Sequence, residues 1–329
     1  GILIVIISSA LGVTAIQLST KALLEQQEEL MLNYADETAN YISSEIGRNL
    51  SVLSEVAMRS EMGAMDWAVQ RQALAEDVAR LGYEDMAVIQ PDGTAYYVIS
   101  GETAQLGERD YFKKAMEGIP NTSGVLISKV TGKPVVMDSA PIQSENQVVG
   151  VLVGRRDGTF LKTITDSQGI GERGYAFILG KDSTIYAHPN ESMILEQRNA
   201  LGEIESNGTL KAYGLALQEL GMGNRGMTNY NFEGDKRLTA MTPIPNTDWM
   251  VGIGNYESDV LAGVHFLRNT LVIIAVAVIL IGIMTALFLG NRISRPIRNL
   301  REMANRVALG DVEIVAETNL KDEVGDLVV

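Results

Sequence analysis

The sequence predicts an α+β fold in which a long N-terminal helix leads into two small tandem modules. A membrane helix stands on either side, and a short cytoplasmic helical segment ends the chain. Three observations predict this fold. Residues 1–18 and 270–290 contain no charged side chain. Residues 21–59 keep a helical spacing of apolar side chains, and two pairs of similar segments recur in the same order further on.

The two uncharged segments are predicted to be membrane helices. Residues 270–290 are long enough to cross a hydrocarbon core of about 30 Å, and no face of this segment is polar. A signal peptide is the alternative for 1–18, but its apolar run exceeds the usual length of about 7–15 residues. Positive charge concentrates on the cytoplasmic side, so residues 19–268 are expected to be extracytoplasmic. The arginines behind this orientation follow the second segment, at positions 292, 295, 298, 301 and 306.

The segment 21–59 is predicted to form one long helix. Neither proline nor glycine occurs in it before Gly47. Its apolar residues recur mostly at steps of three, four or seven, as they do on one face of a helix. The predicted apolar face consists of Leu30, Tyr34, Tyr41, Ile42, Ile46, Leu50, Leu53 and Ala57.

A weak internal duplication follows the helix. AVIQPDGTAY (87–96) resembles FILGKDSTIY (177–186), and each predicts two apolar strands around a turn. PIQSENQVVGV (141–151) resembles PIPNTDWMVGI (243–253), with proline and glycine at the same spacing. Two α+β modules, at about 85–160 and 172–256, are therefore expected.

Composition excludes several classes of function. The chain carries a net charge of −14, which argues against the basic face that nucleic acid requires. It has no cysteine and only two histidines, so a cysteine-based or histidine-rich metal site is excluded, and His188 is interpreted as structural. GIGERG (169–174) and GMGNRG (221–226) each follow a predicted helix and precede a strand, the reverse of a dinucleotide site. No catalytic residue, metal or cofactor is predicted, and the chain is not expected to be an enzyme.

The C-terminal segment 291–329 contains a short helical seam. Apolar residues spaced by four and three form an a/d pattern that is too short to be stable alone, so a second copy of the chain is the simplest partner. The seam residues are Ile293, Ile297, Leu300, Ala304 and Val307.

These segments resemble two known families. RPIRNLREMANRVALGDVEI and the later DEVGDL, with its Asp322–Gly325 motif, resemble a HAMP linker, here incomplete. RDYFKKAMEG, TGKPVVMDSAPI and VVGVLVGRRDG resemble the distal module of a double Cache sensor domain, and GYAFILGKDSTIYAHPN and MTPIPNTDWMVGIG resemble its proximal module. The resemblance implies that both modules are PAS-like.

The resemblance also implies a ligand site in the distal module. Arg109 to Phe112 match the R-x-[WY]-[YF] segment of that family. In its amino-acid-sensing members the arginine and aromatic side chains hold the ligand carboxylate, and a later aspartate holds the amine. Carried over, this gives Arg109, Tyr111, Asp138 and Asp157 as ligand-binding residues. A guanidinium group offers the planar donors that fit a carboxylate.

Alternatives remain open for these residues. Ala104 stands where the amino-acid pattern has an aromatic residue, so an amine or a nucleobase is also a candidate ligand. Arg109 alternatively braces the start of a helix, Phe112 is expected in the core, and Asp157 alternatively pairs with the arginines before it.

The function implied is that of a transmembrane methyl-accepting chemotaxis protein that lacks its C-terminal part here. It is expected to bind a small extracellular ligand, such as an amino acid or other small carboxylate or amine. It is expected as a homodimer, multi-pass in the bacterial plasma membrane, with an adaptor and a histidine kinase as cytoplasmic partners and with neither cofactor nor nucleic acid. The alternative is the sensory half of a histidine kinase or of a diguanylate cyclase or phosphodiesterase, with its catalytic module beyond residue 329.

Overall fold

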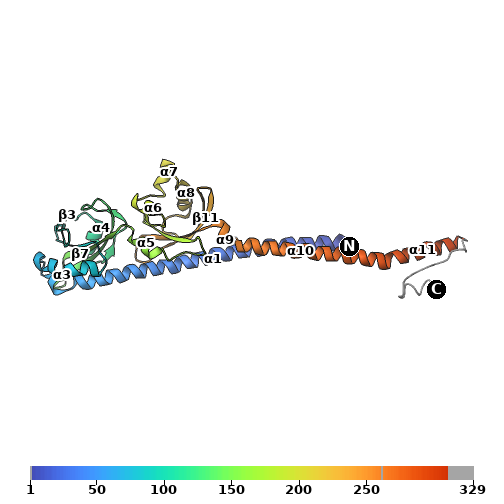
Figure 1. The fold of residues 1–329 in the computed structure, drawn as a ribbon, viewed down its shortest axis with the longest axis horizontal. Helices are drawn as coiled ribbons and strands as arrows, with labels where there is room; N and C mark the ends of the chain where they lie inside the picture. The colour runs from blue at the N-terminus through green and yellow to red at the C-terminus, as the bar shows by residue number, and fades with distance from the viewer. Residues whose placement is uncertain (1, 261, 310–329) are drawn as a thin grey trace. The chain divides into compact units, whose positions relative to one another are not determined.

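The computed structural model describes residues 2–260 and 262–309 and confirms the predicted α+β class (Figure 1). The chain divides into two compact units. One is Glu25–Leu261, and the other combines Gly1–Leu24 with Ala262–Val329. Helix α1 (Ile2–Ala57) belongs in part to both units. The larger unit contains two sheets that follow one another along α1 (Figure 1).

Helix α1 packs against both sheets with one face. That face differs from the predicted one, because Leu30 and Tyr41 are 51% and 43% exposed. Ala35 and Ala39 are buried in their place, since small side chains let a helix backbone approach a sheet closely. The buried α1 residues in the core of the second sheet are Met31, Ala35, Ala39, Ile42 and Ile46, and those in the core of the first are Leu53, Val56 and Ala57.

The first module holds a seven-stranded antiparallel sheet with the strand order β3-β2-β1-β7-β6-β4, in which β5 also pairs with β6. The turn between β6 and β7 is formed by Glu145 and Asn146, whose positive φ values of 49° and 65° suit a tight hairpin. The elements are α2 (Ser60–Gly63), α3 (Trp67–Arg80), β1 (Asp85–Ile89), β2 (Thr94–Tyr97), β3 (Thr103–Gln105), α4 (Asp110–Met116), β4 (Asn121–Thr122), β5 (Leu126–Ile127), β6 (Pro134–Ser144) and β7 (Gln147–Asp157).

The two faces of the first sheet are covered by different helices. Successive side chains of a strand point to opposite faces. Met86, Val88, Ile142 and Leu152 share a core with residues of α1 and α3. On the other face, Ala87, Ile89, Val151 and Val153 share a core with Tyr111 and Phe112 of α4. Neighbouring residues of one strand therefore meet different partners.

The second module repeats the strand arrangement of the first. Its five-stranded sheet has the order β10-β11-β12-β8-β9. The opening strand pairs with the last strand in both modules, β1 with β7 and β8 with β12. The elements are α5 (Phe160–Thr165), β8 (Tyr175–Leu179), β9 (Ile185–Ala187), α6 (Glu191–Leu195), α7 (Gly202–Ser206), α8 (Lys211–Leu220), β10 (Gly226–Phe232), β11 (Asp235–Pro243) and β12 (Met250–Tyr256).

The two glycine-rich motifs lie in loops between a helix and a strand. GIGERG connects α5 to β8, and GMGNRG connects α8 to β10. A dinucleotide-binding motif needs the opposite order, because the pyrophosphate meets the N-terminus of the helix that follows. Neither loop has that helix.

The described residues of the C-terminal segment form several helical elements. Helix α9 (Glu257–Val260) is followed by α10 (Ala262–Leu289), the π-helical turn η1 (Gly290–Ser294) and α11 (Arg295–Ala308). Among the described residues, His265–Arg306 is the one helical stretch whose length and apolar composition suit a membrane crossing, and it is not buried.

Several predictions fall on residues outside the described set. The Asp322–Gly325 motif and the rest of 310–329 lie there, as do the side chains of residues 1–9 in the first predicted membrane segment. Of the predicted seam, Ile297 and Ala304 are described, and both are exposed.

Candidate functional site

Arg109 is positioned by the start of helix α4. It is the N-cap residue, with an extended backbone and no capping side-chain hydrogen bond. Asp110 in the first turn and Lys113 and Lys114 in the last turn suit the helix dipole. The Arg109 Nη2 donates to the carbonyl of Ile127 at 3.1 Å, while its buried Nε has no hydrogen-bond partner among the described residues.

The aromatic residues that follow Arg109 lie under α4, against the sheet. Tyr111 is 4% exposed and Phe112 is 6% exposed, so Phe112 belongs to the core as predicted. Burial raises the pKa of the Tyr111 hydroxyl above its usual value, and the nearby Tyr97 adds to this effect. Tyr111 therefore offers a neutral hydroxyl on the α4 face.

Asp138 does not join Arg109, which corrects the prediction that both hold one ligand. It lies on β6 with Val136 and Ala140, and Ala140 belongs to the core on the α1 and α3 side. One Asp138 carboxylate oxygen accepts hydrogen bonds from Tyr83 Oη and Arg156 Nε, each at 3.0 Å. It is 2% exposed and forms a buried ion pair with Arg156. Because α4 covers the opposite face, Asp138 is part of the structural core.

Asp157 is likewise occupied elsewhere. Its exposed carboxylate accepts hydrogen bonds from the backbone N–H of Thr159 at 2.8 Å and from the Thr159 hydroxyl at 2.5 Å. No hydrogen bond or ion pair joins Asp157 to Arg109 within the described part of the chain. Asp157 thus stabilises the turn after β7.

Arg155 and Tyr97 were missed by the sequence reasoning. Arg155 is 6% exposed, its guanidinium carbon lies 5.2 Å from the centroid of the Tyr97 ring, and Nη2 lies 3.7 Å from an Asp85 oxygen. Its Nε and Nη1 are buried without a hydrogen-bond partner in the described structure. The charges of both Arg155 and Arg109 act on the Tyr97 hydroxyl.

A Glu84 oxygen forms an ion pair with the Arg155 Nε at 3.6 Å, beyond hydrogen-bond distance. Asp85 does not satisfy these nitrogens either. Its carboxylate accepts hydrogen bonds from three backbone N–H groups, those of Met86, Ile99 and Ser100. Each buried donor without a partner costs about 1–3 kcal/mol. Arg109 and Arg155 therefore present buried donors suited to an anion.

A polar cleft adjoins Arg109 and Tyr111. It has a volume of about 640 Å³ and includes Arg109, Tyr111 and Lys114 of the first module. Asp182 and Trp249 of the second module line the opposite side. The cleft is thus an access route to Arg109 within the unit Glu25–Leu261.

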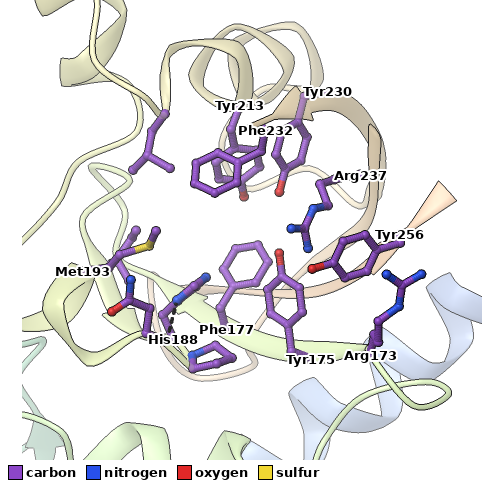
Figure 2. Close-up of a pocket in the computed structure, with 14 residues that line it drawn as sticks. Arg173, Tyr175, Phe177, His188, Met193, Tyr213, Tyr230, Phe232, Arg237 and Tyr256 are labelled. Carbon is purple, nitrogen blue, oxygen red and sulfur yellow. Dashed lines mark hydrogen bonds between the residues drawn. The ribbon is translucent and has the colours of Figure 1, made fainter. Parts of the chain in front are cut away.

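The second module contains a separate aromatic cavity of about 280 Å³ (Figure 2). His188 lines it, and the Nδ1 atom of His188 accepts a hydrogen bond from the Asn190 N–H at 3.0 Å. Burial lowers the pKa of His188 to about 4, so its ring is neutral at pH 7. This bond satisfies one ring nitrogen, as expected of a structural histidine, but the place of His188 in a cavity was not predicted.

This depressed pKa predicts a pH dependence of stability. Between about pH 6.5 and pH 4 the unfolded chain binds a proton at His188 that the folded chain does not, so stability falls as the pH falls through this range. The contribution is roughly 3 kcal/mol over the full range. In H188Q the free energy of unfolding, measured by urea titration of residues 25–261, should decline less steeply by that amount. Parallel curves for the two proteins would contradict the assignment.

The sequence model of the Cache domain (dCache_1) matches residues 17–264, and that of the HAMP domain matches residues 288–329. The methyl-accepting chemotaxis protein McpA of Bacillus subtilis (strain 168) is 28% identical over 232 residues, which cover 67% of this chain and 31% of McpA. TlpB of the same organism is 24% identical over 294 residues, which cover 86% of this chain and 38% of TlpB. The chain thus spans about a third of the length of these relatives.

Two solved ligand-binding domains share the fold. That of the Pseudomonas aeruginosa PAO1 amino acid chemoreceptor PctB, in complex with L-Arg, superposes with a TM-score of 0.55 and 15% identity, covering 71% of this chain and 97% of that domain. That of the Pseudomonas fluorescens chemoreceptor CtaA, in complex with L-isoleucine, gives 0.58 and 15%, covering 74% and 98%.

Proposed function

Because the chain belongs to the Cache domain family and carries a HAMP domain, we propose that it is the sensing part of a transmembrane methyl-accepting chemotaxis receptor. Matching relatives are methyl-accepting chemotaxis proteins, and the helix His265–Arg306 suits a membrane crossing. The receptor is multi-pass with residues 19–268 outside the cell. It works as a homodimer, and its cytoplasmic part signals through an adaptor and a histidine kinase rather than by catalysis.

The ligand of the first module is a small carboxylate, with amino acids included in that class. Buried guanidinium nitrogens of Arg109 and Arg155 without hydrogen-bond partners carry this proposal. Tyr97 and Tyr111 supply hydroxyl groups on the same face. L-Arg and L-isoleucine, found in the related PctB and CtaA domains, share this carboxylate group.

Recognition in this site depends on the carboxylate rather than on the amine. Asp138 is paired with Arg156 on the opposite face of the sheet, and Asp157 accepts from Thr159. Asp85 is occupied by backbone N–H groups. None of Asp85, Asp138 and Asp157 is therefore left to hold an ammonium group, and acids without an amine should bind as well.

The test is a thermal-shift screen of residues 25–261 against amino acids and matched acids without the amine, such as L-alanine with propionate and L-leucine with 4-methylvalerate. At a concentration of 100 times Kd a ligand stabilises by about 2.7 kcal/mol, which raises Tm by roughly 5–10 °C. R109Q should lose this rise and keep the Tm of the free domain. K113Q removes an exposed charge from the same helix and should keep the rise.

Two outcomes would reject the proposal. One is a rise of equal size in R109Q and the unsubstituted domain for the same ligand. The other is stabilisation by simple alkylamines and by none of the acids.

A further inference from the structure

The aromatic cavity of the second module is not used by the proposed function. We propose that it is a second ligand site, specific for a small anion with an apolar or aromatic body. The charged residues of its lining are basic, the buried Nε of Arg237 has no hydrogen-bond partner among the described residues, and its volume of about 280 Å³ suits such a ligand. It is independent of the site at Arg109.

The charged side chains that line the cavity are all basic. They are the two arginines Arg173 and Arg237, and the described lining contains neither aspartate nor glutamate. Arg173 is neutralised by Asp259, since its Nε donates to a carboxylate oxygen of that residue at 2.7 Å and its Nη2 to the other oxygen. Arg237 is therefore the charge that a ligand in the cavity would meet.

Arg237 lies over an aromatic ring instead of a carboxylate. Its guanidinium carbon is 3.6 Å from the centroid of the Tyr256 ring. Its Nε is buried and has no hydrogen-bond partner among the residues that the structure describes. A ring face attracts a cation weakly and leaves the planar donors of the guanidinium available to a carboxylate.

Further donors converge on the same point. Figure 2 shows the Arg237 guanidinium between the hydroxyl groups of Tyr175 and Tyr230. Burial raises the pKa of both tyrosines, so their hydroxyl groups stay protonated. The Tyr175 hydroxyl is in side-chain hydrogen-bond contact with Tyr230 and with Arg237. His188 accepts at Nδ1 and is neutral, which leaves the proton on Nε2, the second ring nitrogen.

The remainder of the cavity accepts an apolar group. Phe177, Met193, Tyr213 and Phe232 line it away from Arg237 (Figure 2). The volume is about 280 Å³. An apolar cavity of about 150 Å³ holds benzene. There is thus room for one ring or a branched alkyl group together with a carboxylate.

The aromatic lining by itself is also typical of sites for quaternary ammonium ions. Such sites attract the cation by ring faces. Here Arg237 lies over the ring of Tyr256, and no carboxylate of the described lining offsets its charge. A ligand cation would meet a like charge in a partly desolvated space, so the anion is favoured.

The experiment is isothermal titration calorimetry of the whole 329-residue chain in lipid nanodiscs. The probes are phenylacetate, its neutral amide phenylacetamide, and the cation benzyltrimethylammonium. We expect phenylacetate to bind at least about tenfold more tightly than the amide, and the cation not to bind, because the charge-assisted bonds to Arg237 are lost in both.

Matched variants separate this site from the first. R237Q should weaken phenylacetate binding at least about tenfold. K236Q removes the charge of the adjacent exposed residue and should leave the Kd within about twofold. R237K keeps the charge but loses the planar fork, so it should bind more weakly than the unsubstituted chain and still prefer the acid to the amide.

Each remaining outcome overturns the proposal. These are the absence of phenylacetate binding, equal affinity for the acid and the amide, a preference for the cation, or unchanged binding in R237Q. Circular dichroism melting of each variant shows that it is folded, and R237K carries the test if R237Q is not. If phenylacetate does not bind as expected, the thermal shift produced by ligands of Arg109 is unaffected. The two proposals are therefore tested separately.

Discussion

Replacing Arg156 with methionine is expected to lower the free energy of unfolding of residues 25–261 by about 3–5 kcal/mol. Arg156 is 7% exposed, and its Nε donates to Asp138 at 3.0 Å. Its Nη1 donates to the carbonyls of Leu81 and Gly82 at 3.2 and 3.1 Å. The substitution leaves the Asp138 charge buried with only the Tyr83 hydroxyl as a donor, and two carbonyls lose a donor.

Aromatic contacts add to this loss. The Arg156 guanidinium carbon lies 4.0 Å from the centroid of the Tyr83 ring and 4.3 Å from that of Phe160. For a domain of this size the Tm should fall by roughly 10 °C. Urea titration followed by circular dichroism measures the change in free energy.

The double variant D138N/R156M is the control for this prediction. It removes both charges, so the uncompensated carboxylate is gone and more than half of the lost stability should return. A loss of less than about 1 kcal/mol in R156M would mean that the pair contributes nothing net. A double variant as unstable as R156M would place the effect in packing rather than in charge.

Replacing the adjacent Arg155 with methionine is expected to have little effect on the free energy of unfolding. Stability should change by less than about 1 kcal/mol, because the substitution also removes two buried nitrogens without hydrogen bonds. Asp85 keeps the three backbone N–H groups that it accepts from, so no bare carboxylate remains.

Ligand affinity of the first module, in contrast, should fall at least about thirtyfold in R155M, since truncating a buried charged partner costs about 2–5 kcal/mol. Calorimetry of residues 25–261 with the most stabilising acid of the thermal-shift screen measures this Kd. Unchanged affinity would remove Arg155 from the site. A loss of stability as large as that of R156M would show that Arg155 has a structural role instead.

The contrast between Arg155 and Arg156 explains why the site was predicted only in part. The alternation of side chains along a strand could be predicted from the sequence, and it placed Asp138 with Val136 and Ala140 on one face. The sequence could not predict which helix covers that face, because α4 and α1 are both amphipathic and neither is next to β6 in the chain. Arg109 and Tyr111 were found through a contiguous segment, whereas Arg155 and Tyr97 lie on strands that follow or precede it by many residues.

The cavity of the second module had no local signal at all. Its arginines and aromatic residues come from strands β8, β10, β11 and β12, helix α8 and the loops before β8 and after β9. Each residue alone resembles an ordinary core or edge residue. The duplication of the modules was visible, but it predicts similar strands rather than similar cavities.

The sequence by itself determined the membrane-compatible segment, the long helix, the two hairpin-based modules and the α+β class. These follow from hydropathy, periodicity and turn residues, which act over a few neighbouring positions. The tertiary structure alone decided that Asp138 and Arg156 form a buried pair while Arg155 and Arg109 share the α4 face. It also decided that Arg237 lines a cavity whose described residues include neither aspartate nor glutamate. The physical reason is that the partner of a buried charge is chosen by chain segments brought together only when the sheets and helices pack.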